Sequence, residues 1–257
     1  MSTKTLKIPN GSTLYYRGDP LEKGPQPAVF YFSISGKESL ELGPFNQPAA
    51  FLEGKGIRVF SLDLPFHGEG QAKEKAMEAW ALSFAKGDNL VKPFIESVST
   101  AIDTLFELQA LTEGKVVAAG LSRGAFIATH LAAADSRIST VLGYAPLTNL
   151  TTAQTFNHLN DNTLVQSLGI DKLIDKLQGI AVRYYIGNRD ILVSTASCFD
   201  CIRQLADAKF ASGEREPQAE LIISPSVGHK GHGTLPHIFR SGTDWLEDKL
   251  LNHKEVS

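Results

Sequence analysis

Short runs of β-branched and aromatic residues alternate with amphipathic segments along most of this chain. Between those runs, segments of helical pattern cover 47–56, 74–85, 93–111, 124–135 and 195–213, and a last one covers 237–251. Strands that alternate with helices are typical of βαβ units, in which parallel strands are joined through helices. The pattern therefore predicts an α/β fold with a mostly parallel sheet and helices on both faces. The expected strands are 28–33, 58–63, 115–120, 139–145, 181–187 and 219–224.

Two further strands are expected near the start of the chain. Residues 5–8 and 13–17 flank the turn sequence Pro9-Asn10-Gly11, which favours an antiparallel pair. They bring the sheet to eight strands. The interval 146–178 is polar and rich in Asn and Thr, and we interpret it as a small insertion. At 257 residues, the chain is expected to form a single domain over 1–257.

Charge and hydropathy exclude several classes of partner. The formal net charge is −3, so no basic field favours nucleic acid or an anionic membrane surface. No apolar stretch approaches the roughly 20 residues that span a bilayer. The first residues lack the apolar region of a signal peptide, so we expect a cytoplasmic location. The expected partner is a small-molecule substrate, and the oligomeric state stays open.

The sequence G-L-S-R-G at 120–124 lies between an apolar run and a run of small residues. A strand, tight turn and helix here would force Ser122 into a strained backbone conformation, and Gly120 and Gly124 would remove the clashes. The hydroxyl would then project at the N-terminus of a helix, where a developing anion is favoured. The backbone N–H of Arg123 would point to the same place, as one half of an oxyanion hole.

At these residues the chain resembles the α/β-hydrolase superfamily, and within it the branch of dienelactone hydrolases and prolyl-oligopeptidase-like serine esterases. A second stretch, RVFSLDLPFHGEG at 58–70, is similar to the family's D-x-x-G-H-G loop, with Pro65-Phe66 before His67-Gly68. The resemblance implies an α/β-hydrolase fold and a structural role for His67. It also implies a Ser nucleophile, an acid and a His base, in that order along the chain.

The stretch AVRYYIGNRDILV at 181–193 resembles the family's G-x-x-D-x-x-V segment, which makes Asp190 the expected acid. A carboxylate there would fix the tautomer of the base and stabilise its charged form. The alternative is that Asp190 pairs with Arg189 or caps a helix that begins near Thr195. The interval 146–178 also contains acidic residues, but they follow no strand end: Asp161, Asp171 and Asp175.

Three histidines follow the last expected strand. Pro225-Ser226-Val227-Gly228-His229 matches the family's P-x-x-G-H form, so His229 is the preferred base. His232, between two glycines, is the alternative, and His237 is expected on the terminal helix. The histidine that is not the base would bind substrate or hold the loop.

The loop after the strand at 28–33 should supply the second oxyanion donor. It reads Ser33-Ile34-Ser35-Gly36-Lys37 and lacks the His-Gly that many family members carry. Counting from Pro27, the donor is the backbone N–H of Ser35, whereas a shifted alignment makes it that of Lys37. Three apolar residues could line an acyl pocket, with ordinary core packing as the alternative: Phe66, Phe156 and Leu192.

The only cysteines, Cys198 and Cys201, form a C-x-x-C within a helical pattern. Without a second pair or a thioredoxin-like context, this spacing favours packing over a redox or zinc site. We therefore expect neither a metal nor a cofactor.

Together these features predict a serine hydrolase that cleaves a carboxylic ester, a thioester or a lactone through an acyl-enzyme intermediate. The alternative is a non-catalytic binding or regulatory protein with the same fold. The missing His in the 33–37 loop and the unusual Arg123 favour that alternative, whereas the three triad residue types in the family's order favour the enzyme.

Overall fold

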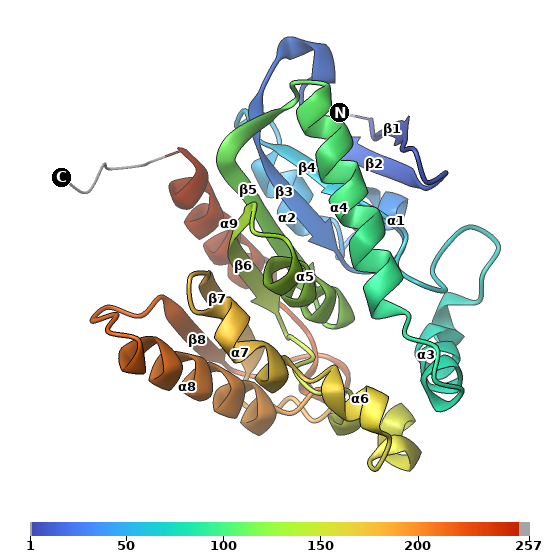
Figure 1. Ribbon diagram of the computed structural model, residues 1–257, viewed down its shortest axis with the longest axis vertical. Helices are drawn as coiled ribbons and strands as arrows, with labels where there is room; N and C mark the ends of the chain where they lie inside the picture. Colours follow the sequence, from blue (N-terminus) through green and yellow to red (C-terminus); the bar gives the residue numbers. More distant parts are fainter. Residues whose placement is uncertain (1, 252–257) are drawn as a thin grey trace.

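An eight-stranded sheet runs through the centre of the molecule, with helices on both faces (Figure 1). The computed structural model describes residues 2–251. The strand order is β1-β2-β4-β3-β5-β6-β7-β8. Strand β2 pairs antiparallel with both β1 and β4, and every other pair is parallel. The α/β class and the mostly parallel sheet are thus confirmed. The strands are β1 (Lys4–Lys7), β2 (Thr13–Arg17), β3 (Gln26–Phe32), β4 (Arg58–Ser61), β5 (Leu111–Leu121), β6 (Ile138–Tyr144), β7 (Ala181–Gly187) and β8 (Ala219–Ser224).

The alternation of side chains along β3 divides the core into two layers. Val29 and Tyr31 pack on one side of the sheet, with α1, α2 and α9, whereas Phe30 and Phe32 pack on the other, with α3, α4, α5 and α8. In Figure 1 the second group lies in front of the sheet. The helices are α1 (Gly36–Glu41), α2 (Gln47–Leu52), α3 (Ala76–Ala85), α4 (Val91–Glu107), α5 (Arg123–Ala134), α8 (Thr195–Ala211) and α9 (Pro236–Leu251).

The interval between β6 and β7 folds into short helical turns. Leu150, Phe156 and Val165 bury their side chains in the same core layer as α3 and α5. The elements of this insertion are 3-10 turns at Leu150–Thr152, Gln154–Leu159 and Ile170–Leu173, with α6 (Thr163–Ser167) and α7 (Ile174–Leu177). None of the helices between residues 2 and 251 combines the length and apolar character that crossing a bilayer requires.

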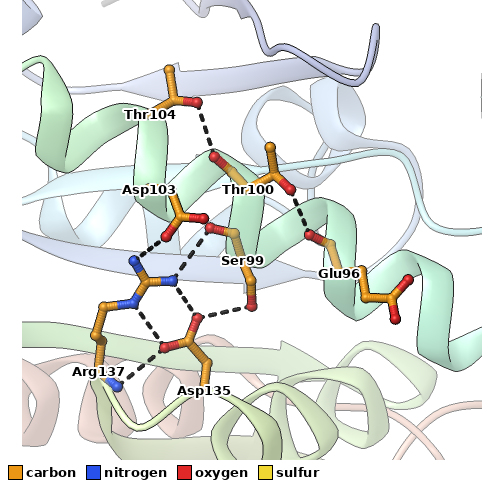
Figure 2. A network of polar contacts seen from close by, with 7 residues as sticks. All are labelled: Glu96, Ser99, Thr100, Asp103, Thr104, Asp135 and Arg137. Carbon is orange, nitrogen blue, oxygen red and sulfur yellow. Dashed lines mark hydrogen bonds and ion pairs between the residues drawn. The ribbon is translucent and has the colours of Figure 1, made fainter.

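A partly buried network of ion pairs and hydrogen bonds anchors the C-terminal end of α5 to α4 (Figure 2). The guanidinium of Arg137 donates to the Asp135 carboxylate from Nε at 2.8 Å and from Nη2 at 2.6 Å, and its Nη1 lies 2.5 Å from Asp103 Oδ1. Ser99 Oγ on α4 donates to the same Asp135 carboxylate at 2.8 Å. This network fixes the far end of the helix whose N-terminus carries Ser122.

Two differences from the sequence prediction lie close to the site or to the strand that leads to it. The helix expected over 93–111 ends at Glu107, because Gln109 adopts a positive φ of 54° and Leu111 already begins β5. Helix α1 was not predicted. It is initiated by Ser35, whose Oγ accepts from the Glu38 N–H at 3.3 Å and donates to the Glu38 carboxylate at 2.6 Å.

Candidate active site

Ser122 lies at the turn between β5 and α5 in a strained backbone conformation. Its φ is 57° and its ψ is −119°, a combination that L-residues rarely adopt. The Ser122 N–H donates to the carbonyl of Tyr144 at 2.8 Å, and its carbonyl accepts from the N–H of Ala125 at 3.0 Å and of Leu147 at 3.3 Å. Surrounding backbone therefore holds the turn.

The two glycines of G-L-S-R-G have the steric role expected for them. A Cβ at Gly120 would lie 2.1 Å from the carbonyl carbon of Gly124, across the turn. A Cβ at Gly124 would lie 1.9 Å from the carbonyl oxygen of Phe32, at the end of β3. Only glycine fits at either position without moving the backbone.

His232 connects Ser122 to Asp190. Its Nε2 lies 2.9 Å from Ser122 Oγ, and its Nδ1 lies 2.7 Å from Asp190 Oδ2. Because a carboxylate only accepts, Nδ1 carries the proton and Nε2 is free to accept from the serine hydroxyl. The His232 side chain is 19% exposed, whereas the Asp190 carboxylate is fully buried.

Asp190 follows β7, at the carboxyl end of the sheet. Its Oδ1 accepts from the backbone N–H groups of Leu192 at 3.0 Å and Val193 at 3.2 Å, which orients the carboxylate toward His232. Between residues 2 and 251 no ion pair joins Asp190 to Arg189. The cap of α8 is Ser194 and not Asp190. The acidic residues of the insertion, Asp161, Asp171 and Asp175, do not contact His232.

The preference for His229 over His232 is corrected by this geometry. His229 is exposed, and its side chain makes no hydrogen bond within residues 2–251, whereas His237 is exposed on α9. The chain makes two consecutive turns after the strand, with positive φ at Gly228, Lys230 and Gly231. Because of these turns, the imidazole that faces Ser122 is that of His232, three residues after the P-x-x-G-H match ends.

The glycines that flank His232 were the signal that could have identified it. A Cβ at Gly231 would lie 2.2 Å from the carbonyl oxygen of Arg189, and one at Gly233 would lie 2.8 Å from the carbonyl oxygen of Val227. The histidine loop therefore packs directly on the loop that carries the acid.

Two backbone amides near the turn at Ser122 have no hydrogen-bond partner within residues 2–251. They belong to Arg123, the first residue of α5, and to the buried Ser35. The Gly36 N–H between the two candidate donors of this loop is occupied, since it donates to Asp63 Oδ1 at 2.7 Å. Lys37 lies further on, within α1. The loop begins at Ser33, directly after Phe32, the last residue of β3, which packs against Gly124 in the turn at Ser122. This arrangement favours Ser35 over Lys37.

Comparison with solved structures identifies the architecture. TT1662 from Thermus thermophilus superposes with a TM-score of 0.72 at 19% identity, covering 98% of this chain and 100% of that one. A cold-adapted esterase from an Arctic intertidal metagenomic library gives a TM-score of 0.67 at 20% identity, covering 96% of this chain and 93% of the esterase. The chain has the α/β-hydrolase fold.

Some structures that share the α/β-hydrolase fold are much longer. A protein from Bacteroides ovatus ATCC 8483, described as a dipeptidyl aminopeptidase IV, gives a TM-score of 0.71 at 15% identity. The match covers 96% of this chain but 35% of that one, so this chain spans about a third of that protein's length. No protein-family model matches the sequence, and no curated protein matches it.

A cavity of about 240 Å³ opens beside Ser122. Leu192 lines it, as the sequence suggested, whereas Phe156 is fully buried in the core and Phe66 packs against that core. The insertion between β6 and β7 contributes Leu147, Ala153, Gln154 and Thr155. The other residues around the cavity are Met77, Ser122, Arg123, Val193 and His232.

A contact between His67 and Arg123 was not foreseen from the sequence. Arg123 Nη1 lies 2.9 Å from His67 Nε2, and His67 Nδ1 lies 2.8 Å from the carbonyl oxygen of Pro65. His67 is fully buried, and this burial, with the positive charge of Arg123, lowers the pKa of His67 to about 4. His67 thus holds the Arg123 side chain as a neutral imidazole.

Cys198 and Cys201 lie buried on α8 as free thiols. Burial raises the pKa of both, that of Cys201 to about 12, so neither is a thiolate at neutral pH. The part of the chain that the structure describes contains no group of three or more His, Cys, Asp or Glu side chains placed to hold a metal ion.

Proposed function

We propose that the protein is a serine hydrolase that cleaves a carboxylic ester, thioester or lactone through a covalent acyl-enzyme. The observation that carries the proposal is the continuous chain of hydrogen bonds from Ser122 Oγ through His232 to the buried Asp190 carboxylate. A serine hydroxyl is a weak nucleophile at neutral pH, and an imidazole within hydrogen-bond reach activates it.

In the first half-reaction, Ser122 Oγ attacks the substrate carbonyl carbon while its proton passes to His232 Nε2. The Asp190 carboxylate stabilises the resulting imidazolium through Nδ1. As the tetrahedral intermediate collapses, His232 returns the proton to the leaving oxygen or sulfur. The acyl group is then bonded to Ser122, and the alcohol or thiol has left; with a lactone, the alcohol stays attached to the acyl chain as a free hydroxyl.

In the second half-reaction, water attacks the acyl-enzyme, and His232 accepts one of its protons. Collapse of the second tetrahedral intermediate breaks the bond to Ser122 Oγ, which takes the proton back from His232. The carboxylic acid product leaves, and the enzyme returns to its starting state. No metal or cofactor takes part in either half of this cycle.

The negative charge on the substrate oxygen would be stabilised by the unpaired N–H groups of Arg123 and Ser35. Such donors act in a site that is already ordered before reaction, so they stabilise the transition state without a reorganisation cost. Removing one donor of this type typically slows catalysis by about 10²–10³. Because both donors are backbone groups, the absence of the family's His-Gly is compatible with activity.

The esterase among the similar structures supports an ester as the bond cleaved. The small cavity supports a small-molecule acyl substrate, and we place the protein with the esterases of the dienelactone hydrolase and prolyl-oligopeptidase-like branch. We also propose that residues 1–257 act as a single domain.

A fluorophosphonate probe tests the proposal directly. It should label wild-type protein at Ser122, and Ser122→Ala should abolish both the labelling and the hydrolysis of p-nitrophenyl acetate. A folded wild-type protein that neither reacts with the probe nor cleaves short p-nitrophenyl or thiophenyl esters would instead support the non-catalytic binding protein.

A further inference from the structure

We propose that the acyl chain of the substrate carries a carboxylate, which the guanidinium of Arg123 binds within the cavity beside Ser122. This inference rests on the proposed hydrolase function and adds the class of substrate. It would make the enzyme a hydrolase of half-esters of short dicarboxylic acids.

The charge of Arg123 is not neutralised by the protein. Within residues 2–251 no carboxylate forms an ion pair with it, whereas Arg17, Arg137 and Arg183 each pair with an acidic side chain. Burial lowers the pKa of the Arg123 guanidinium, with no acidic neighbour to oppose the shift. Enclosing an unpaired cation costs free energy, which an anionic ligand would offset.

His67 positions this cation without neutralising it. Since the Pro65 carbonyl can only accept, His67 Nδ1 carries the ring proton and Nε2 accepts from Arg123 Nη1. Trp80 Nε1 donates to the same Pro65 carbonyl at 2.9 Å, which fixes the loop. A neutral acceptor restricts the orientation of the guanidinium and leaves its full positive charge.

The remaining edge of the guanidinium is open. Nε and Nη2 of Arg123 have no hydrogen-bond partner within residues 2–251. Both atoms remain accessible to solvent, and Arg123 lines the cavity. The planar fork of Nε–H and Nη2–H matches the two oxygens of a carboxylate. The other side chains around the cavity include Met77, Leu147 and Leu192, which suit a short methylene chain.

The acyl side is favoured over the leaving group because Arg123 directly follows the nucleophile. The acyl chain stays bonded to Ser122 Oγ through both half-reactions, within the cavity that Ser122 and Arg123 share. Hydrolysis of such a half-ester consumes one water and yields the dicarboxylate, the alcohol and one proton at neutral pH.

The test compares monoethyl glutarate with its neutral isostere, ethyl 5-amino-5-oxopentanoate, by proton release at pH 7.5. The wild type should prefer the anionic ester in kcat/KM, and Arg123→Met should reduce the ratio of the two kcat/KM values by roughly 10- to 100-fold. The ratio cancels any effect of the substitution on catalysis shared by both esters. Arg215→Met removes an exposed arginine just before β8 and should leave the ratio unchanged.

Binding measurements separate this inference from the proposed function and do not depend on turnover. Calorimetry should show that wild-type protein binds glutarate at least about 10-fold more tightly than its neutral diamide, glutaramide, and that Arg123→Met loses this preference. The inference is overturned if the wild type binds both equally, or if it hydrolyses the neutral ester as well as the anionic one. Absence of fluorophosphonate labelling and of turnover of every ester tested, with an intact preference for glutarate, would overturn the hydrolase function but not the anion site. Because the wild type alone gives the binding comparison, a variant that fails to fold does not prevent the test.

Discussion

The Cα of Gly124 lies so close to Phe32 that an added Cβ would be 1.9 Å from the Phe32 carbonyl oxygen and 2.4 Å from its carbonyl carbon. Gly124 follows the proposed nucleophile by two residues, and Phe32 ends the strand before the loop that contains Ser35. This contact therefore fixes the distance between the two halves of the proposed oxyanion hole.

Gly124→Ala should destabilise the protein by at least about 3 kcal/mol, because the methyl group meets backbone atoms that cannot move aside without displacing β3 or α5. Gly179→Ala is the matched control, since Gly179 has open space around its Cα and no positive φ. Urea unfolding measures both. Similar stability of the two variants would contradict the steric role of Gly124.

His232→Ala should lower kcat for a p-nitrophenyl ester by about 10³–10⁴ or more, because the serine would lose its base. His229→Ala should change kcat by less than about 3-fold, since its exposed side chain contacts neither Ser122 nor Asp190. The reverse result, with His229→Ala inactive, would contradict the triad geometry.

The contrast between these histidines shows where sequence reasoning reached its limit. The strand spacing and the G-L-S-R-G turn depend on local sequence, so the sheet and the positions of Ser122 and Asp190 directly after β5 and β7 could be predicted. The position of the base depends on how two turns with positive φ, at Gly228 and Lys230–Gly231, fold back on the Asp190 loop. A match to P-x-x-G-H does not encode that path, because it ends before the second turn.

The stability of the protein should decrease as the pH falls below about 6.5. His67 and His130 are buried, and burial lowers the pKa of each to about 4 in the native protein. In the unfolded chain both histidines have the ordinary pKa of 6.5, so they become protonated there at a higher pH. The unfolded state thus gains protons between about pH 6.5 and 4 that the native state does not bind. For each such group, the free energy of unfolding falls by at most about 1.4 kcal/mol per pH unit in this window.

Urea unfolding at pH 7.5, 6 and 5 measures this effect. His130→Gln should reduce the pH dependence, because glutamine does not titrate and could still donate to the Leu168 carbonyl that His130 contacts at 2.9 Å. His237→Gln, at an exposed position on α9, should have no effect on it. Equal slopes for wild type and His130→Gln would argue that His130 is protonated in the native state.

The two cysteines should be unreactive in the native protein. Cys198 is fully buried, Cys201 is 5% exposed, and burial raises the pKa of both thiols. With 5,5′-dithiobis(2-nitrobenzoic acid) at pH 8, we expect two thiols per chain only after denaturation. Rapid reaction in native buffer would reopen the redox interpretation of C-x-x-C.

The pairing of Arg123 with His67 could not be derived from the sequence for a different reason. The two residues are 56 positions apart, and their contact requires the loop after β4 to lie against the N-terminus of α5. The sequence showed Arg123 to be unusual within G-L-S-R-G, and the family resemblance implied a structural role for His67. The sequence assigns a role only to the Arg123 amide, because the neighbours of its side chain depend on tertiary packing.

The hydrogen bond from Ser122 to His232 joins residues 110 positions apart in the sequence. Three parallel strands, β6, β7 and β8, lie between them along the chain. During folding, the turn at Ser122 can form once β3, β5 and β6 have associated, but the base arrives only when β7 and β8 have been added in order at the edge of the sheet. A partly folded chain would therefore carry a well-formed but unactivated serine. Recovery of enzymatic activity during refolding would report completion of the C-terminal third of the sheet, later than any signal from its centre.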